Sequence, residues 1–238
     1  APDPCAKERP GRWIAHREWP APRIEMRKFW LGARGLEATP QPEAALSILS
    51  PQPTGNMTVE WCSYGGSDGD FPGDQRTDDG CSLCFDTLPL AEPLEFFGAP
   101  MLHLAFSVDR PVAKIAVRLN DVALDGASTR ITYALCGLNH AWDQANPVML
   151  EPGRVYHAAI ALNTIAYAVQ PGRRLRLAIS TACWPQLWPG PDAATLSVHV
   201  AESRLELPVR PPHREDGGLR PFGPPECSAH VPYTVTRE

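Results

Sequence analysis

A serine flanked by glycines is the most suggestive chemical feature of this sequence: Gly65-Gly66-Ser67-Asp68-Gly69. It matches the G-x-S-x-G turn, in which a strand-to-helix bend exposes a nucleophilic serine and helix amides face the oxyanion. The residues that follow, Asp70-Phe71-Pro72-Gly73-Asp74, cannot begin an amphipathic helix. The Asp68 carboxylate beside the serine would also oppose a developing oxyanion. We therefore interpret the match as fortuitous, within a Gly-rich loop, and we expect Ser67 to have no catalytic role.

Five acidic residues in the same stretch raise the question of a cation site. They are Asp68, Asp70, Asp74, Asp78 and Asp79. Carboxylate oxygens suit calcium, but the spacing differs from that of an EF-hand loop. Carboxylates in turns are mostly solvated. We therefore favour solvated turn acids over a calcium site, and we expect no bound metal.

Histidine and cysteine spacing offers no metal site either. The chain has seven histidines, and none has ligand spacing to another. Three of them, His103, His157 and His199, lie in alternating segments, where we expect satisfied positions on a sheet face. Cys81-Ser82-Leu83-Cys84 has zinc or redox spacing, but no second pair exists to complete a site. We interpret these cysteines as structural, and we expect no cofactor.

Two closely spaced tryptophans form the last candidate site, in Trp184-Pro185-Gln186-Leu187-Trp188-Pro189. Exposed planar rings can stack on sugars, whereas large aromatic side chains more often anchor cores. We favour a pair of tryptophans that plugs one end of a β-sandwich. A carbohydrate-binding surface built on Trp184 and Trp188 remains the alternative.

The elements that must position these residues are short strands. Leu175, Leu177 and Ile179 fall on one face of a strand and Arg174, Arg176 and Ser180 on the other, which is the period-2 pattern of a half-buried strand. Residues 114–119 repeat the pattern, with Arg118 on the outer side. Five more alternating segments occupy residues 101–108, 130–135, 155–162, 196–200 and 205–209. So many short strands, separated by turn residues and without intervening helices, predict an antiparallel jelly-roll β-sandwich.

The composition agrees with an all-β class that has few short helices. The 238 residues include 27 prolines, about twice the usual share of ~5%, and proline breaks helices. The Pro-rich N-terminal part contains one alternating run at residues 24–31 and a weak helical pattern at residues 43–49. The seven cysteines, an odd number, form no disulfide framework. They fit a reducing compartment, so we expect a cytoplasmic protein.

Charge and hydropathy argue against nucleic-acid and membrane partners. The net charge is -5, and no block of Lys or Arg stands out. The longest apolar stretch without a charged residue, residues 155–169, is too short and too polar to span a bilayer. The opening Ala1-Pro2-Asp3-Pro4 has neither an initiator Met nor the apolar run of a signal peptide, which fits a trimmed or processed chain.

Several motifs occur in the order typical of one protein family. They are Phe71-Pro72-Gly73-Asp74-Gln75-Arg76, Ser82-Leu83-Cys84-Phe85-Asp86, Val117-Arg118-Leu119-Asn120-Asp121-Val122, Leu150-Glu151-Pro152-Gly153, Pro171-Gly172-Arg173-Arg174-Leu175 and Trp184-Pro185. This series resembles the C-terminal domain of the Xaa-Pro dipeptidyl-peptidase and cocaine-esterase-like (CocE/NonD) serine hydrolases. The resemblance covers nearly the whole chain, because Arg12-Trp13-Ile14-Ala15 is similar to the segment that leads into that domain.

The resemblance implies a galactose-binding-like jelly roll packed against an N-terminal α/β-hydrolase domain, which carries the catalytic Ser, Asp and His. It implies that residues 1–55 are a lead-in after that domain, residues 56–210 the jelly roll, and residues 211–238 a Pro-rich tail that wraps over the sandwich or stays partly disordered. It also places Phe71 where the family has a residue that lines the acyl pocket. A simple plug at the domain interface is the alternative role of Phe71.

We therefore predict the non-catalytic domain of a serine acyl hydrolase that acts on esters or on X-Pro peptides. By itself the chain is expected to be inactive, because we find no set of nucleophile, base and orienting acid in it. Its expected partner is the catalytic domain of the same parent chain, whose cleft it would narrow. A homo-oligomer is compatible with this interpretation. The alternative is a free-standing β-sandwich that binds carbohydrate or another ligand.

Overall fold

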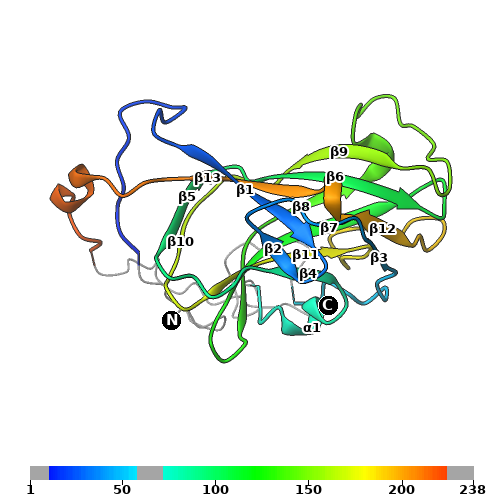
Figure 1. The fold of residues 1–238 in the computed structure, drawn as a ribbon, viewed down its shortest axis with the longest axis horizontal. Helices are drawn as coiled ribbons and strands as arrows, with labels where there is room; N and C mark the ends of the chain where they lie inside the picture. Colours follow the sequence, from blue (N-terminus) through cyan, green and yellow to red (C-terminus); the bar gives the residue numbers. More distant parts are fainter. Residues whose placement is uncertain (1–10, 58–71, 224–238) are drawn as a thin grey trace, which may run out of the picture.

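The computed structural model describes residues 11–57 and 72–223 of the chain. This part is built from two antiparallel β-sheets that lie face to face (Figure 1). The larger sheet runs in the order β10 (Ile165–Val169), β5 (Leu94–Gly98), β13 (Arg204–Val209), β6 (Met101–Val108), β12 (Leu196–His199) and β3 (Ala45–Ile48), joined by β1 (Glu25–Gly32), β2 (Gly35–Glu37) and β9 (Tyr156–Ala161). The smaller sheet runs β4 (Leu83–Asp86), β11 (Arg174–Ser180), β7 (Lys114–Val122) and β8 (Ser128–Gly137).

Helices are few and short, as predicted. The described residues contain one α-helix, α1 (Arg76–Asp79), and three 3₁₀ turns, η1 (Leu138–His140), η2 (Val200–Glu202) and η3 (Arg214–Gly218). None of these helices is long and apolar enough to cross a membrane. The prediction of an all-β antiparallel sandwich is confirmed.

The core lies between the two sheets and follows the alternation seen in the sequence. Leu175, Leu177 and Ile179 of β11 are fully buried, and so are Ile115 and Leu119 of β7. Burying a large aliphatic side chain is favourable by about 1.5–3 kcal/mol, so these inward rows supply much of the force that holds the sheets together. The strands predicted from the period-2 pattern are confirmed.

The N-terminal part contributes strands to the larger sheet. β1 pairs with β13, with Arg27 opposite Leu207. β3 pairs with β12, with Leu46 opposite Val198. The weak helical pattern at residues 43–49 was therefore misleading, because an isolated helix of about two turns is unstable. This segment instead gains backbone hydrogen bonds at the edge of a sheet.

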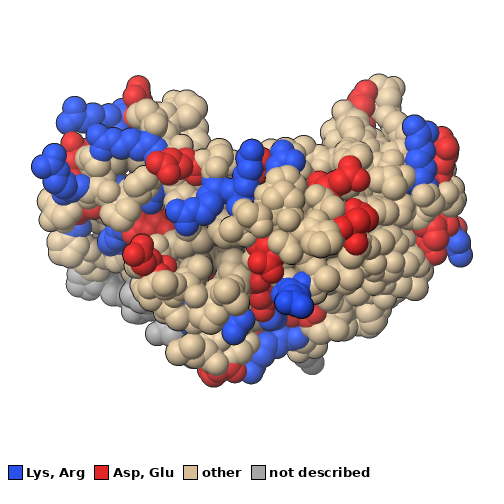
Figure 2. Space-filling view, viewed as in Figure 1, with Lys and Arg blue, Asp and Glu red and all other residues tan. Residues whose placement is uncertain are grey.

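Residues 210–218, which follow β13, are held by a buried arginine. Arg210, which is buried, donates hydrogen bonds to Asp216 of η3 at 2.6 Å and to Glu95 of β5 at 3.2 Å. In Figure 1, η3 lies at the end of the molecule where β1 begins. Figure 2 shows that Lys and Arg side chains gather at that same end, and that the upper edge is hollowed between two projections.

Candidate functional site

A polar cluster covers the outer face of the smaller sheet, and Arg118 of β7 lies at its centre. The Arg118 side chain is only 2% exposed. Its guanidinium donates to Gln75 Oε1 at 3.0 Å and to Ser82 Oγ at 2.8 Å, and it lies 3.2 Å from the Asp79 carboxylate. A buried cation is tolerated only when it is paired and hydrogen-bonded, so these three partners explain how β7 can carry an arginine here.

Asp79 supplies the negative charge that pairs with two arginines, Arg118 and Arg176, on this face of the sheet. It accepts hydrogen bonds from Asn120 at 3.0 Å, from Ser128 at 2.7 Å and from Arg176 at 3.1 Å. Arg176 in turn donates twice to Asp86, at 2.7 Å each. These hydrogen bonds with Asp86 raise the pKa of Arg176 above its ordinary value, so the arginine stays charged.

Asp78 and Gln75 fix the two chain ends that flank residues 58–71. The Asp78 carboxylate accepts from the amides of Gly55 at 2.8 Å and Met57 at 3.1 Å. The Gln75 side chain donates to the carbonyls of Met57 at 2.5 Å and Gly73 at 2.8 Å. The Gly73 amide also donates to the Met57 carbonyl at 3.0 Å. The chain therefore leaves at Met57 and returns at Gly73 in the same place, on a buried polar support.

The prediction of solvated turn acids is wrong for Asp74, Asp78 and Asp79, the three of the five aspartates that the structure describes. Asp78 and Asp79 are 2% and 5% exposed, and Asp74 accepts from the amides of Arg76 and Ser128, each at 3.1 Å. Asp68 and Asp70 lie outside the described residues. No group of three or more His, Cys, Asp or Glu in residues 11–57 and 72–223 is arranged to hold a metal ion.

The sequence carried a signal for this cluster that we did not use. Arg118, Asn120 and Arg176 are polar residues at outer positions of strands, and such positions usually face water. Arg118 and Asn120 are nevertheless buried, because Gln75, Asp79 and Ser82 cover them, and periodicity within a strand does not reveal that cover. The predicted pocket residue Phe71 and the serine of the glycine motif, Ser67, lie outside the described residues.

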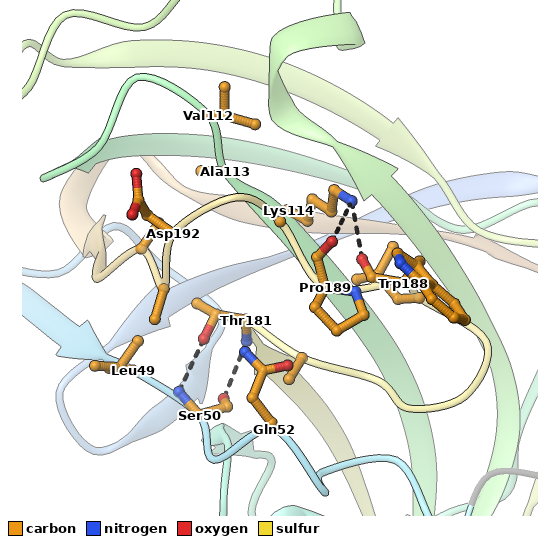
Figure 3. A pocket seen from close by; sticks show the side chains of 15 residues that line it. Leu49, Ser50, Gln52, Val112, Ala113, Lys114, Thr181, Trp188, Pro189 and Asp192 are labelled. Carbon is orange, nitrogen blue, oxygen red and sulfur yellow. Dashed lines mark hydrogen bonds between the residues drawn. The ribbon is translucent and has the colours of Figure 1, made fainter.

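The tryptophan pair is not a plug of the sandwich. Trp188 is 71% exposed and Trp184 37% exposed, so neither side chain lies within the core. Figure 3 shows how the backbone at Trp188 is held: Lys114 Nζ donates to the carbonyls of Trp188 at 2.8 Å and Pro189 at 3.4 Å. The cleft beneath the loop is about 20 Å³, roughly the room for one water molecule, and it is too small for a ligand.

The strand histidines are satisfied on a sheet face, as predicted. His103 lies 3.3 Å from Glu206, and His157 lies 2.8 Å from Glu202. The thiol of Cys84 donates to the Asp79 carbonyl at 3.3 Å. Loss of water around the sulfur and the nearby Asp79 charge raise the pKa of Cys84 to about 12, although the residue as a whole is exposed. A thiol that stays protonated is a poor redox nucleophile.

One contact series resembles a hydrolase triad and was not expected from the sequence. Ser107 Oγ lies 3.1 Å from His199 Nε2, and His199 Nδ1 lies 3.5 Å from Glu43. However, Ser107 lies within β6 and pairs with Ser197 of β12, so its neighbouring amides belong to the sheet ladder. A serine nucleophile needs amides aimed at the oxyanion, and this ladder does not supply them. We therefore assign no catalysis to Ser107.

The sequence matches the family described as X-Pro dipeptidyl-peptidase C-terminal non-catalytic domain over residues 4–217. It is also similar to the cocaine esterase of Rhodococcus sp. (strain MB1 Bresler), with 24% identity over 189 residues. That alignment covers 73% of this chain and 33% of the esterase. The chain thus spans about a third of the length of this relative.

Solved structures share the fold at low sequence identity. An aminopeptidase from the marine sediment archaeon Thaumarchaeota archaeon has a TM-score of 0.70 and 18% identity, covering 82% of this chain and 38% of its own. An α-amino acid ester hydrolase has a TM-score of 0.63 and 22% identity, and the match covers 78% of this chain and 36% of the hydrolase. A CocE/NonD family hydrolase from Staphylococcus aureus has a TM-score of 0.62 and 12% identity, and the match covers 83% of this chain and 39% of that hydrolase. From the match over residues 4–217, the chain belongs to the family of X-Pro dipeptidyl-peptidase C-terminal non-catalytic domains.

Proposed function

We propose that this chain packs against the α/β-hydrolase domain of a serine acyl hydrolase and forms one wall of its substrate cleft. The substrates of that parent enzyme would be esters or X-Pro peptides, and the serine that forms the acyl-enzyme would lie outside this chain. The relatives support the class, because they are named as an esterase, an aminopeptidase and an ester hydrolase. Each has more than half of its length beyond the part that matches this chain.

The observation that carries the proposal is the anchoring of Met57 and Gly73 by Asp78 and Gln75. A side chain that shapes a pocket must be held within a fraction of an ångström, and buried hydrogen bonds to the backbone achieve this. Phe71 is two residues before Gly73 in the sequence. We propose that Phe71 lines the acyl pocket, supported by the family resemblance and by this anchored return of the chain.

The experiment compares acyl preference in the complete gene product. Phe71→Ala should widen the acyl pocket and shift the ratio of kcat/KM between a short-chain and a bulky p-nitrophenyl ester by about tenfold, because a few methylene groups in an apolar pocket change discrimination by that order. Phe222→Ala, which removes a half-exposed ring elsewhere, is the matched control. A ratio unchanged by Phe71→Ala would refute the role of Phe71.

A further inference from the structure

Trp184 and Trp188 form an exposed apolar surface with Gln52, Pro53, Asn56 and Pro189, which we name the tryptophan platform. Most of these residues line an open hollow of about 670 Å³. None of these six residues has an ionisable side chain, although charged residues make up 21% of the chain. Exposed apolar patches of this kind mark binding surfaces, and tryptophan is one of the residues enriched in the energetically dominant centre of interfaces.

The backbone of the platform is held rigidly. The Trp184 amide donates to the Thr54 carbonyl at 2.7 Å, and Lys114 holds the carbonyl of Trp188. Gly55 has a φ of +110°, and a Cβ there would lie 2.7 Å from the Trp184 nitrogen. Only glycine allows this close approach. The exposed rings are therefore presented on fixed supports, which lowers the entropy cost of binding.

The geometry points to one occupant: we propose that the catalytic part of the same polypeptide docks on the tryptophan platform. This inference rests on the proposed function. Asn56 of the platform immediately precedes Met57, whose amide and carbonyl are held by Asp78 and Gln75. The platform and the anchored chain ends thus share one continuous face. The relatives extend well beyond the matched region, which covers 33–39% of their length, so their chains contain a partner for such a face.

Carbohydrate is a less suitable occupant. The two indole planes are inclined by 52°, with centroids 5.2 Å apart. At this inclination the two rings offer no common flat face on which a sugar could stack. The large apolar area that a tryptophan buries instead suits packing against another folded domain.

Hydroxyl-radical footprinting of the complete gene product tests the proposal with an internal control. Trp188 is 71% exposed in this chain and Trp142 is 46% exposed. Docking predicts that Trp188 is oxidised severalfold more slowly than Trp142, with each rate taken relative to the unfolded protein. Trp188 reacting at least as fast as Trp142, in the order of these exposures, would overturn the proposal.

Two further measurements separate the possible failures. Trp188→Ala should lower the thermal midpoint of the gene product or split its unfolding into two transitions, whereas Leu124→Ala, at the opposite end of β7, should leave it unchanged. Quenching of tryptophan fluorescence by cellohexaose that is lost in Trp188→Ala would overturn docking in favour of a sugar site. Ester hydrolysis by a gene product in which Trp188 is reactive would refute the docking surface while leaving the proposed hydrolase function intact.

Discussion

Single charged residues decide whether the outer face of the smaller sheet can be buried. Arg118 and Asp79 are both 2% exposed at the side chain. A buried ion pair often adds little net stability, but removing one partner leaves an uncompensated charge. The pair is therefore better understood as a positioning device: it fixes α1, and α1 carries the Asp78 that holds Gly55 and Met57.

Asp79→Asn is predicted to lower the free energy of unfolding by about 3 kcal/mol, because Arg118 and Arg176 lose a buried counter-charge. Urea denaturation of the chain measures this change. Glu92→Gln, at an exposed acidic residue, should change the free energy of unfolding by less than about 0.5 kcal/mol. Equal effects of the two substitutions would contradict the importance of the buried pair.

The environments of single residues were predictable where the strand pattern alone determines them, and they were not where contacts with a distant segment determine them. His103 and His157 were predicted as satisfied face positions because neighbouring strands supply partners. Trp188 was expected to be buried because large aromatic residues usually are. It is 71% exposed instead, on a loop whose backbone is held by the hydrogen bond from Lys114 to the Trp188 carbonyl.

At the scale of elements, strands of the core were predictable and the edges were not. In β7 and β11 a large aliphatic side chain occupies every second position, which specifies the register of both strands against the core. The prediction for β3 was wrong, since the apolar pattern of residues 43–49 fits a short helix as well as a strand. Its pairing with β12 decides the outcome. The cover over β7 also escaped prediction, because it joins segments that are far apart in the sequence.

The short element η3 provides a pH test. The hydrogen bond from Arg210 lowers the pKa of Asp216 below its ordinary value. A lowered carboxyl pKa contributes stability above the unfolded pKa of about 3.9, and this stability is lost as the pH falls through the folded value. Asp216→Asn should therefore melt at a lower temperature than the wild type at pH 7, and the difference should shrink below about pH 4.

Thermal midpoints of both proteins between pH 7 and pH 3 measure this effect. The expected loss at pH 7 is about 1.5–3 kcal/mol, the usual contribution of a hydrogen bond to a charged group. A difference that persists unchanged to pH 3, or one that is absent at pH 7, would rule out the Arg210–Asp216 pair as the cause.

At the scale of the whole molecule, the sandwich serves as a rigid frame for one functional face. Its two sheets enclose a continuous apolar core, and the anchored ends at Met57 and Gly73 lie beside the tryptophan platform. The family could be inferred from ordered motifs because those motifs, such as Pro171-Gly172 and Trp184-Pro185, mark turns and loops that the sandwich requires. The substrate could not be inferred from the sequence, because a fold does not determine the chemistry of the site that it supports.

Labelling with a fluorophosphonate tests the central claim most directly, since this probe reacts covalently with activated serines. The complete gene product would be labelled, digested and mapped by mass spectrometry, with the 238-residue chain treated in parallel. We predict that the labelled serine lies outside this chain and that the chain alone remains unlabelled. A label on Ser67 or on Ser107 would contradict the account.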